Sequence, residues 1–250
     1  MKILQPLSLV LLTTFLLSAC GGTTETAETT EVVEETPAEP TRTEDGWTVF
    51  FNADTKEGWK QLNGQATYEI KDGVVIGTTK TGEPNSFLAT ARDYSDFILE
   101  YEVMVDTALN SGVQIRSNQY EADTTITITN GEGEQVEREV TKDRVFGYQV
   151  EIDPSPRSYS GGIYEEARRG WLNDLSENEE ARNAFKRDDW NQFRVEAIGD
   201  TLRTYVNGVL ATDITDSETA SGFIALQVHS IPEGKGPLQV MWRNIRLKEM

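Results

Sequence analysis

Three short stretches of this 250-residue chain alternate between apolar and polar residues: 112–116, 148–153 and 225–229. Successive side chains of an extended strand point to opposite faces, so each stretch predicts a β-strand with one apolar and one polar face. The side chains on the polar faces are Gln114, Arg116, Gln149, Glu151, Asp153, Gln227 and His229, the last being the single histidine of the chain. The pattern therefore predicts a polar site built on a β-sheet.

Short strands separated by turn residues dominate the rest of the sequence. Residues 97–105 alternate over nine positions, and Asn207-Gly208 is the strongest hairpin signal because both positions tolerate a positive φ. Residues 121–143, which are polar and rich in threonine, predict an inserted hairpin. Residues 176–187 predict one short helix, with Ser176 and Glu179 as a capping box. We expect an all-β, mostly antiparallel β-sandwich.

The first 20 residues have the features of an export signal. Lys2 precedes an apolar run at 7–17 that is too short to span a bilayer stably. Small residues precede Cys20, as in a bacterial lipoprotein signal, although an ordinary secretory peptide remains the alternative. We expect a mature chain that begins at a lipidated Cys20 and is held on the membrane only by acyl chains. This predicts a location in the bacterial cell envelope, at the outer membrane and facing the periplasm or the surface.

Composition divides the mature chain into a tether and one domain. Residues 21–45 contain eight acidic residues and few apolar ones, so we expect a disordered acidic spacer. Residues 46–250 have the length of a single sandwich domain, without a disulfide because Cys20 is the only cysteine. The formal charge of the chain is −19, which argues against nucleic acid and anionic lipid as partners and is compatible with a neutral sugar. The oligomeric state stays open.

An ordered set of short motifs covers the predicted domain: residues 46–52, 58–59, 110–116, 147–153, 161–164, 222–229 and 242–245. In these motifs the chain resembles the 3-keto-disaccharide hydrolase family, also described as 3-keto-glucoside lyase and hydratase domains. The resemblance implies a concanavalin A-like jelly roll that binds its ligand on the concave face. The insertion at 121–143 is longer than the resemblance leads us to expect, and it would alter the rim of the site.

The resemblance also implies a reaction. A ketone at carbon 3 of a glucose ring acidifies the hydrogen on carbon 2, and the enolate left by a base expels the group on carbon 1. Water added across the resulting double bond completes a net hydrolysis. Such a site needs a base with a pKa near neutrality, a group that stabilises the enolate, and an acid for the leaving oxygen.

The polar faces offer candidates for these catalytic roles. Imidazole titrates nearest to neutrality, so His229 is the expected base, with a structural histidine as the alternative. Arg116 would stabilise the enolate, or form an ion pair with Glu151 or Asp153. These two carboxylates would serve as acid and base, or would bind a divalent cation, the only cofactor considered.

The remaining candidates would bind the substrate. Gln114, Gln149, Gln227 and Asp153 would hydrogen-bond sugar hydroxyls. Tyr164 and Trp171 would form an aromatic wall, although Trp171 fits a core position equally well.

Two other functions fit the same residues. A non-catalytic, lectin-like carbohydrate-binding module also needs amides, an arginine and carboxylates. A direct retaining glycosidase would use Glu151 and Asp153, but the further carboxylate expected three residues after Asp153 is replaced by Pro156. This disfavours the glycosidase, because retaining chemistry needs two carboxylates about 5–5.5 Å apart.

Overall fold

The computed structural model describes residues 41–51, 54–129 and 133–250. The predicted signal peptide, Cys20 and most of the tether lie outside these residues, and they stay predictions. Within the described ranges no helix is long and apolar enough to cross a membrane. The two-residue strand β1 (Thr41–Arg42) falls inside the predicted tether and pairs with β2 (Thr48–Val49). Regular pairing thus begins a few residues before position 46.

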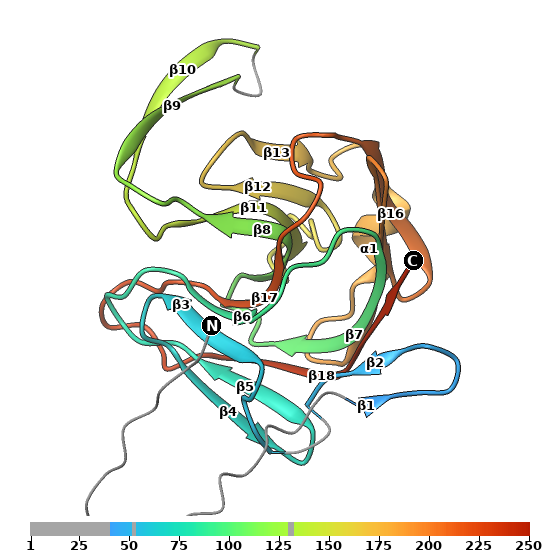
Figure 1. Cartoon of the computed structure of the whole chain (residues 1–250). Coiled ribbons are helices and arrows are strands. Elements are labelled where there is room, and N and C mark those ends of the chain that lie inside the picture. The colour runs from blue at the N-terminus through green and yellow to red at the C-terminus, as the bar shows by residue number, and fades with distance from the viewer. Residues whose placement is uncertain (1–40, 52–53, 130–132) are drawn as a thin grey trace, which may run out of the picture. The chain divides into compact units, whose positions relative to one another are not determined.

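The larger of two main sheets has nine strands (Figure 1). Its central path runs β1, β2, β18, β7, β14, β15 and β16, and β5 pairs with both β18 and β4. Beyond β1 and β2, its members are β4 (Thr67–Lys71), β5 (Val74–Thr78), β7 (Phe97–Val105), β14 (Asn191–Ile198), β15 (Thr201–Val206), β16 (Val209–Thr215) and β18 (Gln239–Glu249).

The second sheet has seven strands in the order β13, β12, β11, β8, β17, β6 and β3. They are β3 (Trp59–Asn63), β6 (Ser86–Thr90), β8 (Ser111–Gln119), β11 (Val145–Ile152), β12 (Ile163–Glu166), β13 (Gly170–Asn173) and β17 (Phe223–Val228). All three stretches with which the sequence analysis began lie here, on the neighbouring strands β8, β11 and β17. Strands distant in sequence thus bring the polar faces together.

The apolar faces of the two sheets form the core. Alternate residues of β7, such as Leu99 and Val103, are fully buried, and so are Val113, Val150 and Leu226 from the seven-stranded sheet. The ladders of both sheets are antiparallel. The predicted all-β, jelly-roll sandwich is therefore confirmed.

Two smaller predictions have different outcomes. The insertion forms a separate two-stranded hairpin, β9 (Thr124–Thr129) and β10 (Gln135–Val140), as expected. The helix α1 spans only Glu179–Ala184 and begins at Asn178, whose side chain accepts a hydrogen bond from the backbone N–H of Ala181. The predicted capping box at Ser176 was wrong, because Asn178 supplies the capping oxygen two residues later.

Candidate functional site

One face of the seven-stranded sheet collects the polar residues of β8, β11 and β17. Gln149 on β11 lies opposite Gln114 on β8, and Glu151 lies opposite Gly112. Gly112 in turn lies opposite Gln227 on β17. Directly paired residues of neighbouring strands point to the same face, so these side chains share one surface, away from the main core.

The amide of Gln149 connects the group. Its Oε1 accepts hydrogen bonds from Nε2 of Gln114 at 2.8 Å and from Nε2 of Gln227 at 2.6 Å. Its own Nε2 donates to Oε2 of Glu151 at 2.8 Å. Asn110, just before β8, donates to the other carboxylate oxygen, Oε1, at 2.5 Å. We call Asn110, Gln114, Gln149, Glu151 and Gln227 the amide–carboxyl network.

Gly112 makes room for this arrangement. A Cβ built on Gly112 would lie 2.5 Å from Cγ and 2.6 Å from Cδ of Gln149. Contacts this short do not occur between carbon atoms, so any larger residue at position 112 would displace Gln149. The glycine is therefore part of the site, since it allows one amide to reach three partners.

Glu151 is the member of the network with an unusual titration. It is 5 % exposed, and burial raises its pKa to about 7, although the hydrogen bonds from Asn110 and Gln149 oppose the rise. The negative charge of Asp153 adds to it. Near neutral pH such a carboxyl exists in both protonation states, as a proton-transfer group requires.

Gln227 carries a buried oxygen that lacks a partner. The residue is fully buried, and its Oε1 accepts no hydrogen bond from any described residue. An unsatisfied buried acceptor costs about 1–3 kcal/mol, so such groups usually meet a water or a ligand. The oxygen is therefore a candidate hydrogen-bond acceptor at this site.

Aromatic side chains flank the network on the β12 side. Tyr164 lies opposite Gln149 on one side and Trp171 on the other, so all three point to the same face. The Tyr164 and Trp171 rings meet edge to face, 5.3 Å apart, and Tyr159 meets Trp171 in the same way at 5.4 Å. Tyr164 and Trp171 are only half-buried. The predicted aromatic side chains thus lie beside the network, and Trp171 is not a core residue.

An apolar cluster covers the opposite flank of the face. It consists of Leu62, Phe87, Ala89, Val145, Phe223 and Ala225. Phe87 lies opposite Gln227 across β6 and β17. The backbone N–H of Val145 donates to Oδ1 of Asn63 at 3.3 Å, which joins β11 to the distant strand β3 across the face. The cluster therefore lies beside Gln227 at one flank of the polar face.

Arg116 does not join the network. Two residues of β8, Ile115 and Arg116, oppose the single Ile224 of β17, and the φ of Arg116 is 45°. Such a bulge breaks the alternation. The guanidinium instead donates to the carbonyl oxygens of Ser95 and Gly199, both at 2.7 Å, and to Oδ1 of Asp96 at 2.9 Å.

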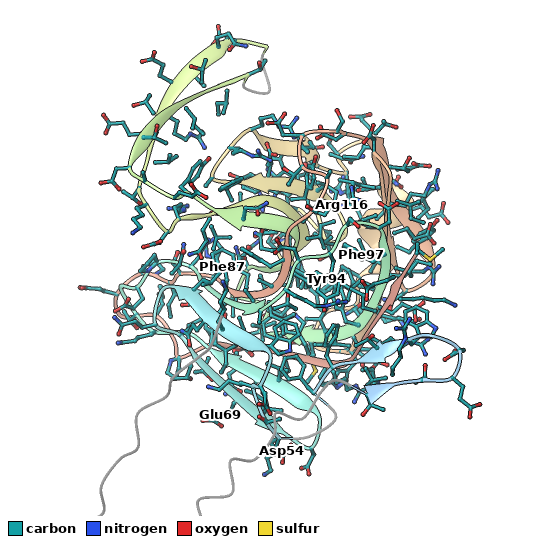
Figure 2. The ribbon with its side chains drawn as sticks, in the orientation of Figure 1. Asp54, Glu69, Phe87, Tyr94, Phe97 and Arg116 are labelled. Carbon is teal, nitrogen blue, oxygen red and sulfur yellow. The ribbon has the colours of Figure 1, made fainter. Side chains whose placement is uncertain are left out.

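Figure 2 shows Arg116 well separated from Phe87, which flanks the network. The expectation that Arg116 contacts the reacting sugar, or pairs with Glu151 or Asp153, is corrected by this placement. The alternation rule failed because the bulge inserts one residue between Gln114 and Ser117, whose hydroxyl then donates to Oε1 of Gln114 at 2.7 Å.

Asp153 is 2 % exposed and organises the loop that follows β11. Its Oδ1 accepts from the backbone N–H of Ser155 at 3.0 Å, and its Oδ2 pairs with Nε of Arg157 at 2.9 Å. Although burial alone would raise the pKa of Asp153, hydrogen bonds from Ser155 and Arg157 lower it below its usual value. Arg157 lies over the Tyr159 and Trp171 rings, so Asp153 positions the aromatic wall indirectly.

The carboxylates do not fit the divalent cation considered above. Both oxygens of Asp153 are already hydrogen-bonded, and Glu151 is held by two amide N–H donors. The described ranges contain no group of three or more His, Cys, Asp or Glu that would hold a metal ion. Ca²⁺ and Mg²⁺ need several oxygen ligands, so we assign no metal to this pair.

His229 directly follows the last residue of β17 and is half-buried. Its Nδ1 lies 2.8 Å from the carbonyl oxygen of Ser230. No hydrogen bond or ion pair joins it to Glu151 in the part of the chain described. Its position two residues after Gln227 keeps it near the end of the polar face, and its catalytic role stays a proposal.

Sequence reasoning missed several groups around the network. Asn110 escaped it because it precedes the alternating stretch. Glu166 is 7 % exposed and pairs with Arg144, whose Nη2 lies 2.9 Å from Oε1 of Glu166. Burial raises the pKa of Tyr164, and the charges of Glu166, Arg138, Glu151 and Arg144 all act on its hydroxyl. Glu166 lies two residues after Tyr164 on the same strand, and extending the alternation to β12 would have found it.

A separate cleft of about 210 Å³ lies between the β2–β3 connection and the residues after β6. Its lining includes the aromatic residues Phe50, Phe51, Trp59 and Tyr94. Among its lining residues the one carboxyl group belongs to Glu57, which is exposed to solvent. Proton-transfer chemistry is therefore better placed at the amide–carboxyl network.

Comparisons with known proteins agree with this architecture. A crystal structure of a candidate glycosyl hydrolase from Parabacteroides distasonis ATCC 8503 is 15 % identical, with a TM-score of 0.54, and the match covers 85 % of this chain and all of that one. Carbohydrate-binding module CBM66 from Bacillus subtilis is 16 % identical, with a TM-score of 0.43, over 77 % and 96 % of the two chains. A β-1,3-1,4-glucanase from a mouse hindgut metagenome is 12 % identical, with a TM-score of 0.46, over 81 % and 97 %.

Of these, the first supports the fold, and none assigns an activity. No curated protein sequence matches the chain. The family model described as 3-keto-alpha-glucoside-1,2-lyase-like domain matches residues 46–248, which is most of the chain. The chain therefore belongs to the 3-keto-α-glucoside-1,2-lyase-like domain family.

Proposed function

We propose that this protein cleaves 3-keto-glycosides by eliminating the group on carbon 1, and that it adds water to the resulting double bond. The observation that carries the proposal is Glu151, a buried carboxyl with a pKa of about 7, held among amides beside a partnerless glutamine oxygen. Family membership supports the choice of 3-keto-glycosides as the substrate class.

Glu151 is the proposed base. As a carboxylate it takes the proton from carbon 2, and the electrons of that C–H bond form the enolate of the 3-ketone. The enolate then re-forms the ketone and a carbon 1–carbon 2 double bond, while the leaving oxygen departs with the C–O electron pair. Hydrogen bonds from Asn110 and Gln149 fix the position of the carboxylate, so little reorganisation is needed.

The amides supply polar contacts to the sugar. A primary amide has two N–H donors, and the hydrogen bonds described use one from Gln114 and one from Gln227. A second donor on each would stabilise the enolate oxygen, the role first expected of Arg116. The free Oε1 of Gln227 would accept a sugar hydroxyl, and Tyr164 with Trp171 would line the ring.

His229 is the proposed partner of Glu151 in proton transfer. It would protonate the departing oxygen or activate the added water. Its half-buried position just after Gln227 supports this role. The hydrogen-bond partner described for its ring is the carbonyl oxygen of Ser230, and this contact does not by itself imply a structural role.

A non-catalytic carbohydrate-binding module is the second candidate. Three amides beside two edge-to-face aromatic rings are what a sugar-binding face needs, and neither group requires turnover. The two functions differ in whether they require the raised pKa of Glu151. A binding module gains nothing from a carboxyl with a pKa of about 7, whereas a base depends on it.

The test is to incubate the purified domain with 3-keto-trehalose, 3-keto-sucrose and methyl 3-keto-glucoside, and with the unoxidised sugars, and to identify products by mass. We expect products from the oxidised sugars alone, and a loss of at least a hundredfold in Glu151→Gln. Glu137→Gln serves as the matched control, because it makes the same change at an exposed residue outside the network. Full turnover by Glu151→Gln would contradict the proposal, and binding without products would favour the module.

We further propose that the domain acts in the cell envelope, tethered through a lipidated Cys20. The apolar run at 7–17 followed by small residues and this cysteine supports that location. Metabolic labelling of the full chain with a fatty acid, compared with Cys20→Ala, tests it. Equal labelling of both chains would contradict the anchor.

A further inference from the structure

The inserted hairpin has two chemically different faces. Cross-strand partners share a face, so Thr125 pairs with Glu139 and Thr127 with Glu137 on an outer face that is exposed. The inner face instead carries Ile126, Ile128, Val136, Arg138 and Val140. Ile128 and Val140 are each 7 % exposed, and Ile126 and Val136 are half-buried. With Thr124 opposite Val140, the inner face is thus mainly apolar, and its one cation, Arg138, is exposed.

The inner face is turned toward the aromatic side of the candidate site. Nη1 of Arg138 donates to the carbonyl oxygen of Arg168 at 2.9 Å, in the turn between β12 and β13. At the base of the hairpin, the Tyr120 hydroxyl donates to the carbonyl oxygen of Ala167 in the same turn, at 3.4 Å. Figure 1 shows the hairpin projecting from the ends of β8 and β11 and curving on the side of β12 and β13.

Arg138 therefore lies on the same side as Tyr164. The charge of Arg138 acts on the hydroxyl of Tyr164, the residue that lies opposite Gln149 of the network. In the described part of the chain Arg138 forms no ion pair, although the protein is strongly acidic and Glu137 and Glu139 flank it in sequence. Those two glutamates point to the outer face. A guanidinium left unpaired beside apolar side chains suits a flat aromatic group, on which it stacks.

We propose that the inner face of the β9–β10 hairpin binds the leaving group of the substrate, and that this group is a planar aromatic ring. The inference rests on the proposed function and names its substrate class: 3-keto-glucosides of phenols. In the elimination, Glu151 takes the proton from carbon 2, the bond between carbon 1 and the phenolic oxygen breaks, and the phenolate leaves with the electron pair. The phenolate then takes a proton from water or from the proposed acid.

The experiment compares kcat/KM for phenyl 3-keto-glucoside and methyl 3-keto-glucoside of the same anomeric form. The full domain should prefer the phenyl compound by more than tenfold. In the double variant Ile126→Ser and Val136→Ser, this preference should fall about tenfold, mainly through KM. Arg138→Lys keeps the charge but not the planar group, and it should lower the preference by a smaller factor.

Matched controls come from the outer face of the same two strands. Thr127→Ala and Glu137→Gln should leave the preference at the wild-type value. A wild-type domain that turns over the methyl compound without preferring the phenyl one overturns this inference and leaves the proposed function intact. An equal fall for both substrates in the inner-face variant also overturns it, since the hairpin would then be only structural. Turnover of neither compound counts against the proposed function itself.

Discussion

The side chain of Gln149 occupies the space directly above Gly112, where a Cβ would lie 2.5 Å from its Cγ. This contact links two strands of the seven-stranded sheet and lets one amide reach Gln114, Gln227 and Glu151. The network therefore depends on Gly112, although a glycine has no side chain with which to form a hydrogen bond.

Replacing Gly112 with alanine should disrupt the network. We expect Gly112→Ala to lose about 1–3 kcal/mol of the free energy of unfolding, because the added methyl forces a shift in packed surroundings. Chemical denaturation and turnover assays check this. In Gln149→Ala the space is empty, so adding Gly112→Ala to that variant should cost little further stability. Equal costs in both backgrounds would show that the contact is not the cause.

Glu151 should make stability depend on pH in the opposite sense to an ordinary ion-paired carboxylate. Its folded pKa is raised from 4.5 to about 7, so between these pH values the folded state holds the extra proton. Stability is then fully present below about pH 4.5 and falls as the pH rises to 7, by up to about 3 kcal/mol. Unfolding of Glu151→Gln should show a shallower fall over this window. Parallel curves for the two proteins would contradict the raised pKa.

The same group predicts the pH profile of the proposed reaction. A base must be deprotonated, so kcat/KM should rise about tenfold per pH unit below 7 and level off above it. The acidic limb of the wild-type curve, measured on methyl 3-keto-glucoside, gives the pKa. If the midpoint of this limb stays near pH 7 in His229→Ala, the ionisation belongs to Glu151. If the limb disappears in that variant, the ionisation belongs to the histidine.

Arg116 should matter for stability and little for turnover. Arg116→Ala would leave the carbonyl oxygens of Ser95 and Gly199 without the guanidinium donor and would remove the charge that pairs with Asp96. We expect a loss of about 2–4 kcal/mol in the free energy of unfolding. Arg203→Ala is the control. Its partner Asp213 is about as exposed as Asp96, but Arg203 itself is exposed, so this variant should not shift the melting midpoint measurably. A folded Arg116→Ala protein with more than a hundredfold lower kcat would restore the arginine to the reaction.

Removal of divalent cations should leave the protein unchanged. The oxygens of Asp153 are occupied by Ser155 and Arg157, and those of Glu151 by amide donors. We therefore expect the same kcat/KM and melting midpoint with and without a chelator. Activity lost to the chelator and restored by one specific metal would contradict this assignment.

Two predicted residues show how far alternation can be followed. The pattern around Gln114 and Gln149 placed both amides correctly, because side-chain direction in a regular strand is a local property of the backbone. The same pattern misplaced Arg116, two residues further along β8, because a bulge depends on the strand opposite. Asp153 lies beyond the end of β11, where the strand rule no longer holds.

The sequence by itself determined the strand-rich sandwich, the hairpin at 121–143, and the placement of Gln114, Gln149, Glu151 and Gln227 on the polar faces of their strands. All of these follow from the two-residue period of strands and from turn residues, which neighbours in sequence decide. Only the tertiary structure decided that these strands lie side by side and that the pKa of Glu151 is raised to about 7. That shift requires burial, which depends on how segments far apart in the chain pack together.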